Sequence, residues 1–244
     1  MEKEDKLKKK LMLYLLDYLN LTTCCSSIDF PNVKNYDVID PDYIALYKER
    51  GLYHYSKNTI VSFYNFDEVF DSSKGLYESI RTNNQKEIFK FIERFNGCKY
   101  FIEPDYSQCG DINNIINIIN IFKARVVSIW LTMTFNAIVI PNITYASRDM
   151  FDFMVLGLDE CEVVAMSTKG SMDDDEEKEL FEDAVKYTVD NLKKLKRIIV
   201  YTASTKREDV EDLFQYAKDK GIEISIPNNT LLERNMVLTH GKSK

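Results

Sequence analysis

The sequence predicts an α/β protein built on a mainly parallel sheet, because short apolar segments alternate with segments of helical period along most of the chain. Strands that alternate with helices in this way run parallel, since a right-handed crossover returns the chain to the same edge of the sheet. Six such strands are expected, fewer than the eight of a closed (β/α) barrel. The prediction is therefore an open six-stranded sheet or an incomplete (β/α) barrel with an N-terminal helical appendage.

The first 58 residues are predicted to form this appendage and a connecting layer. Residues 3–20 carry apolar side chains at helical spacing, namely Leu7, Leu11, Tyr14, Leu15 and Tyr18. Residues 22–58 hold Pro, Gly, Asn and Ser in irregular order, with one short helix expected from Pro41 to Lys48. We expect residues 59–230 to be the α/β domain and residues 231–244 to be a flexible tail.

Two strands begin the α/β domain. Thr59–Tyr64 is the first, followed by a helix near 66–71 and a second helix over Gln85–Phe95. Lys99–Glu103 is the next strand. A long helix is expected from Asp111 to about Thr132, because apolar residues recur there with helical period and Gly110 or Asp111 can cap it.

Four further strands complete the expected sheet, at residues 136–140, 162–166, 197–201 and 222–226. Helices are expected between them, near residues 148–155, 174–195 and 206–220. The 174–195 segment begins with acidic residues and ends with lysines, which complements the helix macrodipole at both ends.

Composition limits the classes of function. The 244 residues are 45% hydrophobic and 29% charged, as in ordinary globular proteins. A net charge of −7 makes nucleic-acid binding unlikely, since that binding needs Lys and Arg against phosphates, although a local basic patch stays open. Five cysteines without disulfide or zinc spacing indicate reduced thiols. With no clear signal peptide and no expected membrane span, the prediction is a cytoplasmic protein.

Polar residues follow three of the expected strands at their carboxyl ends, where open α/β sheets and (β/α) barrels bind ligands. Asp105 and Ser107 follow the second strand and are the candidate catalytic residues. Asp105 could serve as a general base, a metal ligand or a hydroxyl-binding group. The alternative is that both side chains only hydrogen-bond the turn and cap the next helix.

The other candidates are predicted to bind a ligand. Arg125 lies in an apolar stretch, which favours a carboxylate or phosphate partner. Ser167, Thr168 and Gly170 could form a phosphate nest, although the aspartates downstream oppose an anion and ordinary loop composition is the alternative. The remaining ligand-binding candidates are Asn120, Asn142, Tyr145 and Tyr201.

The sequence contains no motif with an established mechanism. It lacks G-x-G-x-x-G, H-E-x-x-H, G-x-S-x-G and an EF-hand loop. With only two histidines, it holds neither a His-based triad nor a multi-His metal site. No metal site is therefore predicted, and the cofactor is unknown.

Five motifs in order give the sequence a family resemblance. They are Pro-Asp-Tyr-Ser at 104–107, Asn-Ile-Phe-Lys-Ala-Arg at 120–125, Ile-Pro-Asn-Ile-Thr-Tyr at 140–145, Ser-Thr-Lys-Gly at 167–170 and Ile-Val-Tyr at 199–201. Together they resemble the family called domain of unknown function 4417, over roughly residues 99–205. The resemblance implies an origin in a bacteriophage, plasmid or other mobile element, and it implies no named reaction.

Two positions depart from the family pattern. Tyr145 stands where an indole is common, and Thr202 stands where the family usually has Gly after the tyrosine. The second departure puts in question a close approach of the backbone to a ligand at that turn.

Two functional hypotheses follow. The first is an enzyme or binder of a small polar ligand, nucleotide-like, at the strand ends. The second is a non-enzymatic interaction protein that engages a host or replication protein through the N-terminal helix or the acidic run at 171–179. The sequence favours the first and leaves the oligomeric state open.

Overall fold

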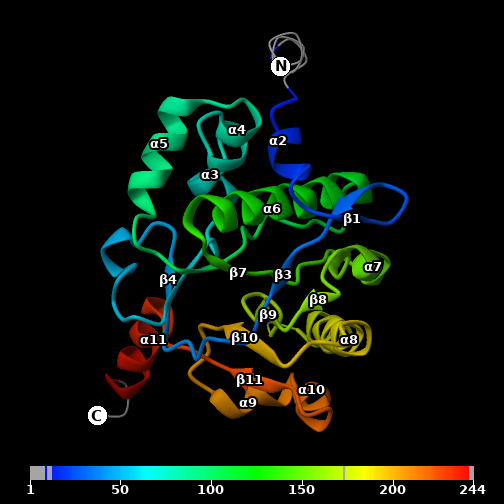
Figure 1. The fold of residues 1–244 in the computed structure, drawn as a ribbon. Helices are drawn as coiled ribbons and strands as arrows, with labels where there is room; N and C mark the ends of the chain where they lie inside the picture. The colour runs from blue at the N-terminus through cyan, green and yellow to red at the C-terminus, as the bar shows by residue number, and fades with distance from the viewer. Residues whose placement is uncertain (1–8, 10–12, 173, 242–244) are drawn as a thin grey trace.

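Two parallel sheets form the centre of the protein in a computed structural model that describes residues 9, 13–172 and 174–241 (Figure 1). The first sheet has the order β4 (Tyr43–Leu46), β5 (Thr59–Ser62), β6 (Tyr100–Ile102) and β7 (Ile138–Ile140). The second has the order β11 (Glu223–Ser225), β10 (Arg197–Tyr201) and β9 (Val163–Ser167). Every pair in both sheets is parallel.

Isolated bridges join the two sheets at both edges. Asn142, just after β7, pairs with Ala165 of β9, and Tyr43 of β4 pairs with Asn228, just after β11. The strands therefore follow one another around a ring in the order β4-β5-β6-β7-β9-β10-β11 and back to β4. The prediction of an α/β protein with mainly parallel strands is confirmed. The alternative of one six-stranded sheet is not found among the described residues, which have sheets of four and three strands.

A side chain closes the ring where β7 and β9 lack a backbone ladder. Asn35, in the short strand β3 (Lys34–Asn35), donates to the carbonyl oxygens of Val139 at 3.1 Å and Val163 at 2.8 Å. Its Oδ1 accepts the N–H groups of Glu162 and Val163. β3 itself pairs with β8 (Glu160–Cys161). Asn35 thus satisfies buried backbone groups of both sheets.

Apolar side chains fill the ring and cover it outside. The interior cluster draws on every strand of the ring except β11, with Ile44, Ile60, Ile102, Ile140, Ala165 and Ile199 among its members. Separate clusters cover the outer faces of the four-stranded and three-stranded sheets. Strands buried on both faces read as apolar runs, which is why the sequence revealed most of them.

Helices cover the outside of each sheet (Figure 1). The first sheet is covered by α3 (Asp67–Phe70), α4 (Leu76–Arg81), α5 (Gln85–Arg94) and α6 (Asn114–Phe135). The second sheet is covered by α7 (Phe151–Met154), α8 (Asp175–Asn191), α9 (Arg207–Asp212) and α10 (Gln215–Asp219). The 3₁₀ turns η1 (Arg50–Leu52) and η2 (Arg148–Met150) and the antiparallel pair β1 (Cys24–Cys25) and β2 (Phe30–Pro31) complete the connections.

Two predicted elements are wrong. The segment from Pro41 to Lys48, expected as a helix, contains strand β4 instead, because its four apolar residues are buried on both faces between β5 and the end of β11. Residues Thr230–Gly241, expected as a flexible tail from 231 on, form helix α11. The Oδ1 of Asn229 accepts the N–H groups of Leu231 and Leu232 and so caps this helix.

The N-terminal helix is described only in part. α2 (Leu16–Leu19) packs beside α6, with Leu15 and Tyr18 against the core of the first sheet. Leu7 and Leu11, which the predicted apolar stripe also includes, lie outside the described residues.

Helix α6 is the one described helix that is long and apolar enough to cross a membrane by length and composition alone. Within its most apolar window, 56% of the residues are buried inside the protein, as in the core helix of a soluble domain.

Candidate functional site

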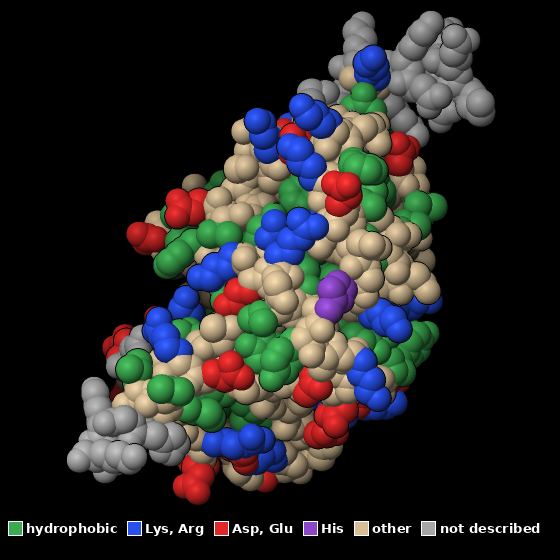
Figure 2. Space-filling model, turned by 90° about the vertical axis from the view of Figure 1, so that its left-hand side faces the viewer, with side chains coloured by type: hydrophobic (Ala, Val, Ile, Leu, Met, Phe, Trp, Pro, Cys, Tyr) green, Lys and Arg blue, Asp and Glu red, His purple; other side chains and the backbone are tan. Residues whose placement is uncertain are grey.

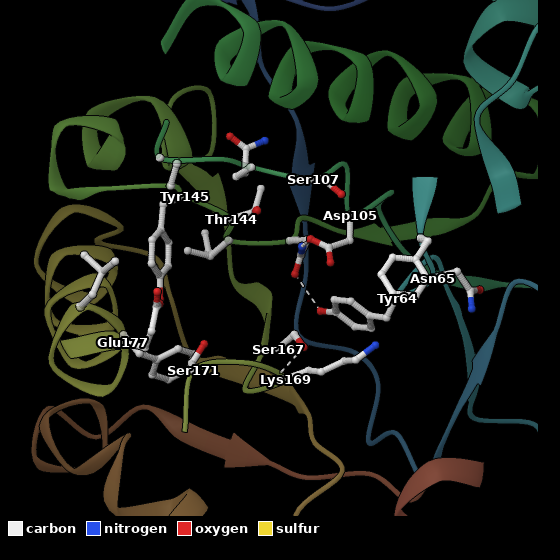
Figure 3. A pocket seen from close by; sticks show the side chains of 18 residues that line it. Tyr64, Asn65, Asp105, Ser107, Thr144, Tyr145, Ser167, Lys169, Ser171 and Glu177 are labelled. Carbon is white, nitrogen blue, oxygen red and sulfur yellow. Dashed lines mark hydrogen bonds between the residues drawn. The ribbon is translucent and has the colours of Figure 1, made fainter. Parts of the chain in front are cut away.

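A cavity of about 370 Å³ opens at the carboxyl end of the strand ring (Figure 3). The ends of four strands supply its walls. Tyr64, Asn65 and Phe66 come after β5, and Asp105 and Ser107 come after β6. Asn142, Thr144 and Tyr145 come after β7. Ser167 ends β9, Lys169 and Ser171 come after it, and Glu177 belongs to α8. The cavity therefore lies at the edge of the strands where the sequence predicts polar groups to meet.

A chain of hydrogen bonds crosses the floor of the cavity. Asn142 donates through Nδ2 to Oδ1 of Asp105 at 2.7 Å, and its Oδ1 accepts the Tyr64 hydroxyl at 2.7 Å. Asn142 is only 3% exposed, so this amide has a single orientation, fixed from both sides. The second carboxyl oxygen of Asp105 has no hydrogen bond within the described residues and is free for a ligand.

The Asp105 carboxyl has an unusual proton affinity. Burial raises its pKa to about 7, with a further increase from the nearby charges of Asp67 and Glu103. The Asn142 hydrogen bond and the positive charge of Lys169 act in the opposite direction. A carboxyl group with this pKa can donate or accept a proton near neutral pH, as a general acid or base does.

Ser107 has a second carboxylate as its partner. Its hydroxyl donates to Oδ1 of Asp67 at 2.9 Å, and its backbone N–H donates to the same oxygen at 3.1 Å. Asn120 donates through Nδ2 to the Ser107 carbonyl at 2.8 Å. These contacts hold the loop after β6 against α3 and α6.

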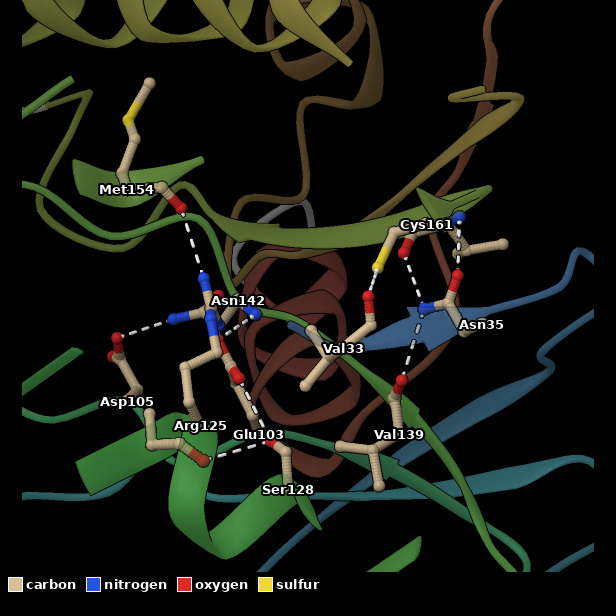
Figure 4. A network of polar contacts seen from close by, with 12 residues as sticks. Val33, Asn35, Glu103, Asp105, Arg125, Ser128, Val139, Asn142, Met154 and Cys161 are labelled. Atoms are coloured by element: carbon tan, nitrogen blue, oxygen red, sulfur yellow. Dashed lines mark hydrogen bonds and ion pairs between the residues drawn. The ribbon is translucent and has the colours of Figure 1, made fainter. Parts of the chain in front are cut away.

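A buried ion pair lies beneath the cavity (Figure 4). Arg125 is 0% exposed and pairs with Glu103, which also accepts the Ser128 hydroxyl at 3.0 Å and the Asn142 N–H at 2.9 Å. Arg125 also donates to the Met154 carbonyl at 3.2 Å. This network joins β6, α6, α7 and the end of β7, and it sets the position of the residue that holds Asp105.

The structure brings together half of the residues predicted to form the site. Asp105, Ser107, Asn142, Tyr145 and Ser167 line the cavity. The other five are not part of its lining. Among the described residues, those that do not line this cavity are Asn120, Arg125, Thr168, Gly170 and Tyr201.

Three of those residues have contacts or a conformation of their own outside the cavity lining. Thr168 donates to the Thr202 hydroxyl at 2.8 Å, both side chains being buried. Gly170 has a φ of +88°, a conformation that favours glycine. Tyr201 stacks on Tyr64 with 4.6 Å between ring centroids. Thr202 has no positive φ, so a residue other than glycine is accommodated at that turn.

Sequence reasoning did not select several lining residues. Tyr64, Asn65 and Phe66 directly follow β5, and the same rule that selected Asp105 after β6 could have found them. Glu177 comes from the first turn of α8, and no local pattern links it to the strand ends.

Within the part of the chain that the structure describes, no group of three or more His, Cys, Asp or Glu side chains could hold a metal ion.

The sequence was compared with known protein families, curated proteins and solved structures. The model of one family, described as domain of unknown function (DUF4417), matches residues 23–218, about four-fifths of the chain. Curated proteins and solved structures gave no significant match.

Proposed function

The chain belongs to the DUF4417 family, and we propose that this protein binds a small polar, nucleotide-like ligand in the cavity at the carboxyl ends of β5, β6, β7 and β9. The observation that carries the proposal is the hydrogen-bonded chain of Asp105, Asn142 and Tyr64 on the cavity floor. A few convergent polar groups, one of them with a shifted pKa, are typical of a ligand site.

The lining suits a ligand with both polar edges and a flat face. Asp105 can offer either a donor or an acceptor near neutral pH, which matches the ring nitrogens and amino groups of a nucleobase or the hydroxyls of a sugar. The aromatic rings of Tyr64, Phe66 and Tyr145 offer surfaces for stacking. The volume of the cavity is at the lower end of the range for small-molecule sites.

Thermal unfolding against a panel of nucleosides, nucleotides and metabolites tests the proposal. A ligand at about 100 times its dissociation constant adds about 2.7 kcal/mol to the free energy of unfolding. We expect this stabilisation in the wild type and in Asp212→Ala, which removes an exposed carboxylate on the outer helix α9, and its loss in Asp105→Ala. Equal stabilisation of Asp105→Ala would place the ligand elsewhere.

A second candidate function, a non-enzymatic interaction protein, is favoured by a group of exposed isoleucines around the start of α6. Ile112, just before the helix, and Ile115, Ile116 and Ile119 within it are 38% to 57% exposed. Exposed apolar patches mark interaction surfaces. Replacing Ile115 and Ile119 by Ser tests it, since loss of a host or replication-protein partner with unchanged ligand binding would support this function.

We also propose that the protein acts in the cytoplasm and originates from a phage or another mobile element. The burial of α6 inside the protein supports the first part, and the order of the five sequence motifs supports the second. Fractionation of cells that express the full chain tests the location.

A further inference from the structure

A second cavity, of about 290 Å³, adjoins the first at the carboxyl end of the ring. Four residues line both cavities: Tyr64, Asn65, Phe66 and Lys169. The second cavity extends from this shared wall to the end of β4 and the first turns of α11. A single ligand that lies along these four shared residues can therefore contact both cavities.

Positive charge distinguishes the second cavity from the first. Lys48, Lys169 and Arg234 line it, all three side chains are exposed, and none forms an ion pair with a described residue. The carboxylate in this lining belongs to Glu49, which accepts the Leu46 N–H at 2.9 Å. Three cations and a single carboxylate therefore line this cavity, in a chain with a net charge of −7.

About half of the other cations in the described part of the chain form an ion pair with a neighbouring acid. Lys90, Lys123, Lys194 and Lys196 each pair with a carboxylate. Figure 2 shows acidic and basic side chains interspersed over one face of the molecule. Lysines and arginines left without acidic partners at a cavity are available for an anionic ligand.

Lys169 links the two cavities. Its Nζ lies 5.4 Å from the centroid of the Phe66 ring, and its charge acts on the Asp105 carboxyl in the first cavity. A ligand whose uncharged part contacts Asp105 in the first cavity can therefore direct an attached group past Lys169 into the second cavity, which Lys48 and Arg234 also line.

We infer that the second cavity is the phosphate subsite of the ligand site, so that the ligand is a nucleoside monophosphate rather than a nucleoside. This inference rests on the proposed function. The nucleoside part occupies the first cavity, and the phosphate occupies the second. A phosphate dianion suits a cavity lined by three cations better than a carboxylate does, because it carries more charge and three acceptor oxygens.

Binding of ribonucleosides and of their 5′-monophosphates to the full chain, measured by calorimetry, tests the inference. The expected result is that one monophosphate binds at least tenfold more tightly than its nucleoside. In the double variant Lys48→Gln/Arg234→Gln, that advantage falls to about threefold or less, while the affinity for the nucleoside is unchanged.

A matched control separates the subsite from general charge. Lys57→Gln/Lys99→Gln removes the same charge from two exposed lysines before β5 and β6, at the opposite end of the ring. This control should keep the full advantage of the monophosphate. An equal loss in both double variants would overturn the inference, because the effect would then come from net charge.

The failures of the two proposals are distinguishable. If a nucleoside binds and Asp105→Ala abolishes that binding, but the monophosphate binds no better, the phosphate subsite is wrong and the proposed function stands. If neither nucleosides nor monophosphates bind, both the subsite and the nucleotide-like ligand are wrong.

Discussion

Glu103 and Asp105 are two residues apart at the end of β6, yet their surroundings are opposite. Glu103 is 1% exposed and is held by Arg125, Ser128 and the Asn142 backbone. Asp105 is partly buried, and its carboxyl has one hydrogen-bond donor, the amide of Asn142. The comparison teaches that two carboxylates at one strand end can differ in their number of partners, and that the proposed ligand site depends on the one with fewer partners.

The largest expected effect comes from breaking the Glu103 network. Arg125→Met leaves the Glu103 carboxylate buried without its cation, which costs roughly 3–5 kcal/mol of unfolding free energy. Urea unfolding measures this loss. The control is Lys123→Met on the same helix, whose partly exposed pair with Asp71 contributes about 1 kcal/mol or less. Equal losses of unfolding free energy in the two variants would contradict a structural role for Arg125.

Asp105→Asn should have the opposite effect and depend on pH. The folded pKa of about 7 lies above the unfolded value near 3.9, so the folded state binds more protons between these pH values. The contribution of the protonated carboxyl to the free energy of unfolding is fully present below about pH 4 and is lost as the pH rises through about 7.

Asparagine imitates the neutral acid, so the variant avoids that loss. We expect Asp105→Asn to be more stable than the wild type by about 2 kcal/mol at about pH 8, with the difference shrinking towards pH 5. The partial exposure of Asp105 to solvent limits the size of this stability difference. Urea unfolding across this range measures it, and a constant difference between the proteins would show an ordinary pKa.

Asn142→Ala sharpens the comparison because Asn142 contacts both carboxylates. The hydrogen bond from its backbone N–H to Glu103 remains in the variant. The hydrogen bond from its side chain to Asp105, which lowers the pKa of Asp105, is lost. The pKa of Asp105 should therefore rise above about 7, with about 1 kcal/mol of stability lost. Thr144→Ala, in the same cavity wall, should leave this pKa unchanged.

The smallest effect is expected at Ser107. Its hydroxyl bonds to Asp67 at an exposed position, so Ser107→Ala should cost less than about 1 kcal/mol in thermal unfolding. A larger loss would mean that the loop after β6 depends on this bond more than its exposure implies.

Local pattern was enough to predict six of the seven ring strands and the edge that carries the cavity. It failed for β4, because a four-residue apolar run after Pro41 is compatible with a short helix or a strand, and only pairing with β5 decides between them. Local pattern selected Asp105 and not Glu103, but it could not show what surrounds either carboxylate. Their roles depend on Arg125 and Asn142, which lie 22 and 37 positions further along the chain from the carboxylates they contact.

The most direct test of the contrast between the two carboxylates is a ¹³C NMR titration of the side-chain carboxyl groups, with the Asp105 signal assigned by its absence in Asp105→Asn. The account predicts a midpoint at about pH 7 that moves when a ligand binds in the cavity. A midpoint near 4, the ordinary value for aspartate, that no stabilising ligand alters would contradict it.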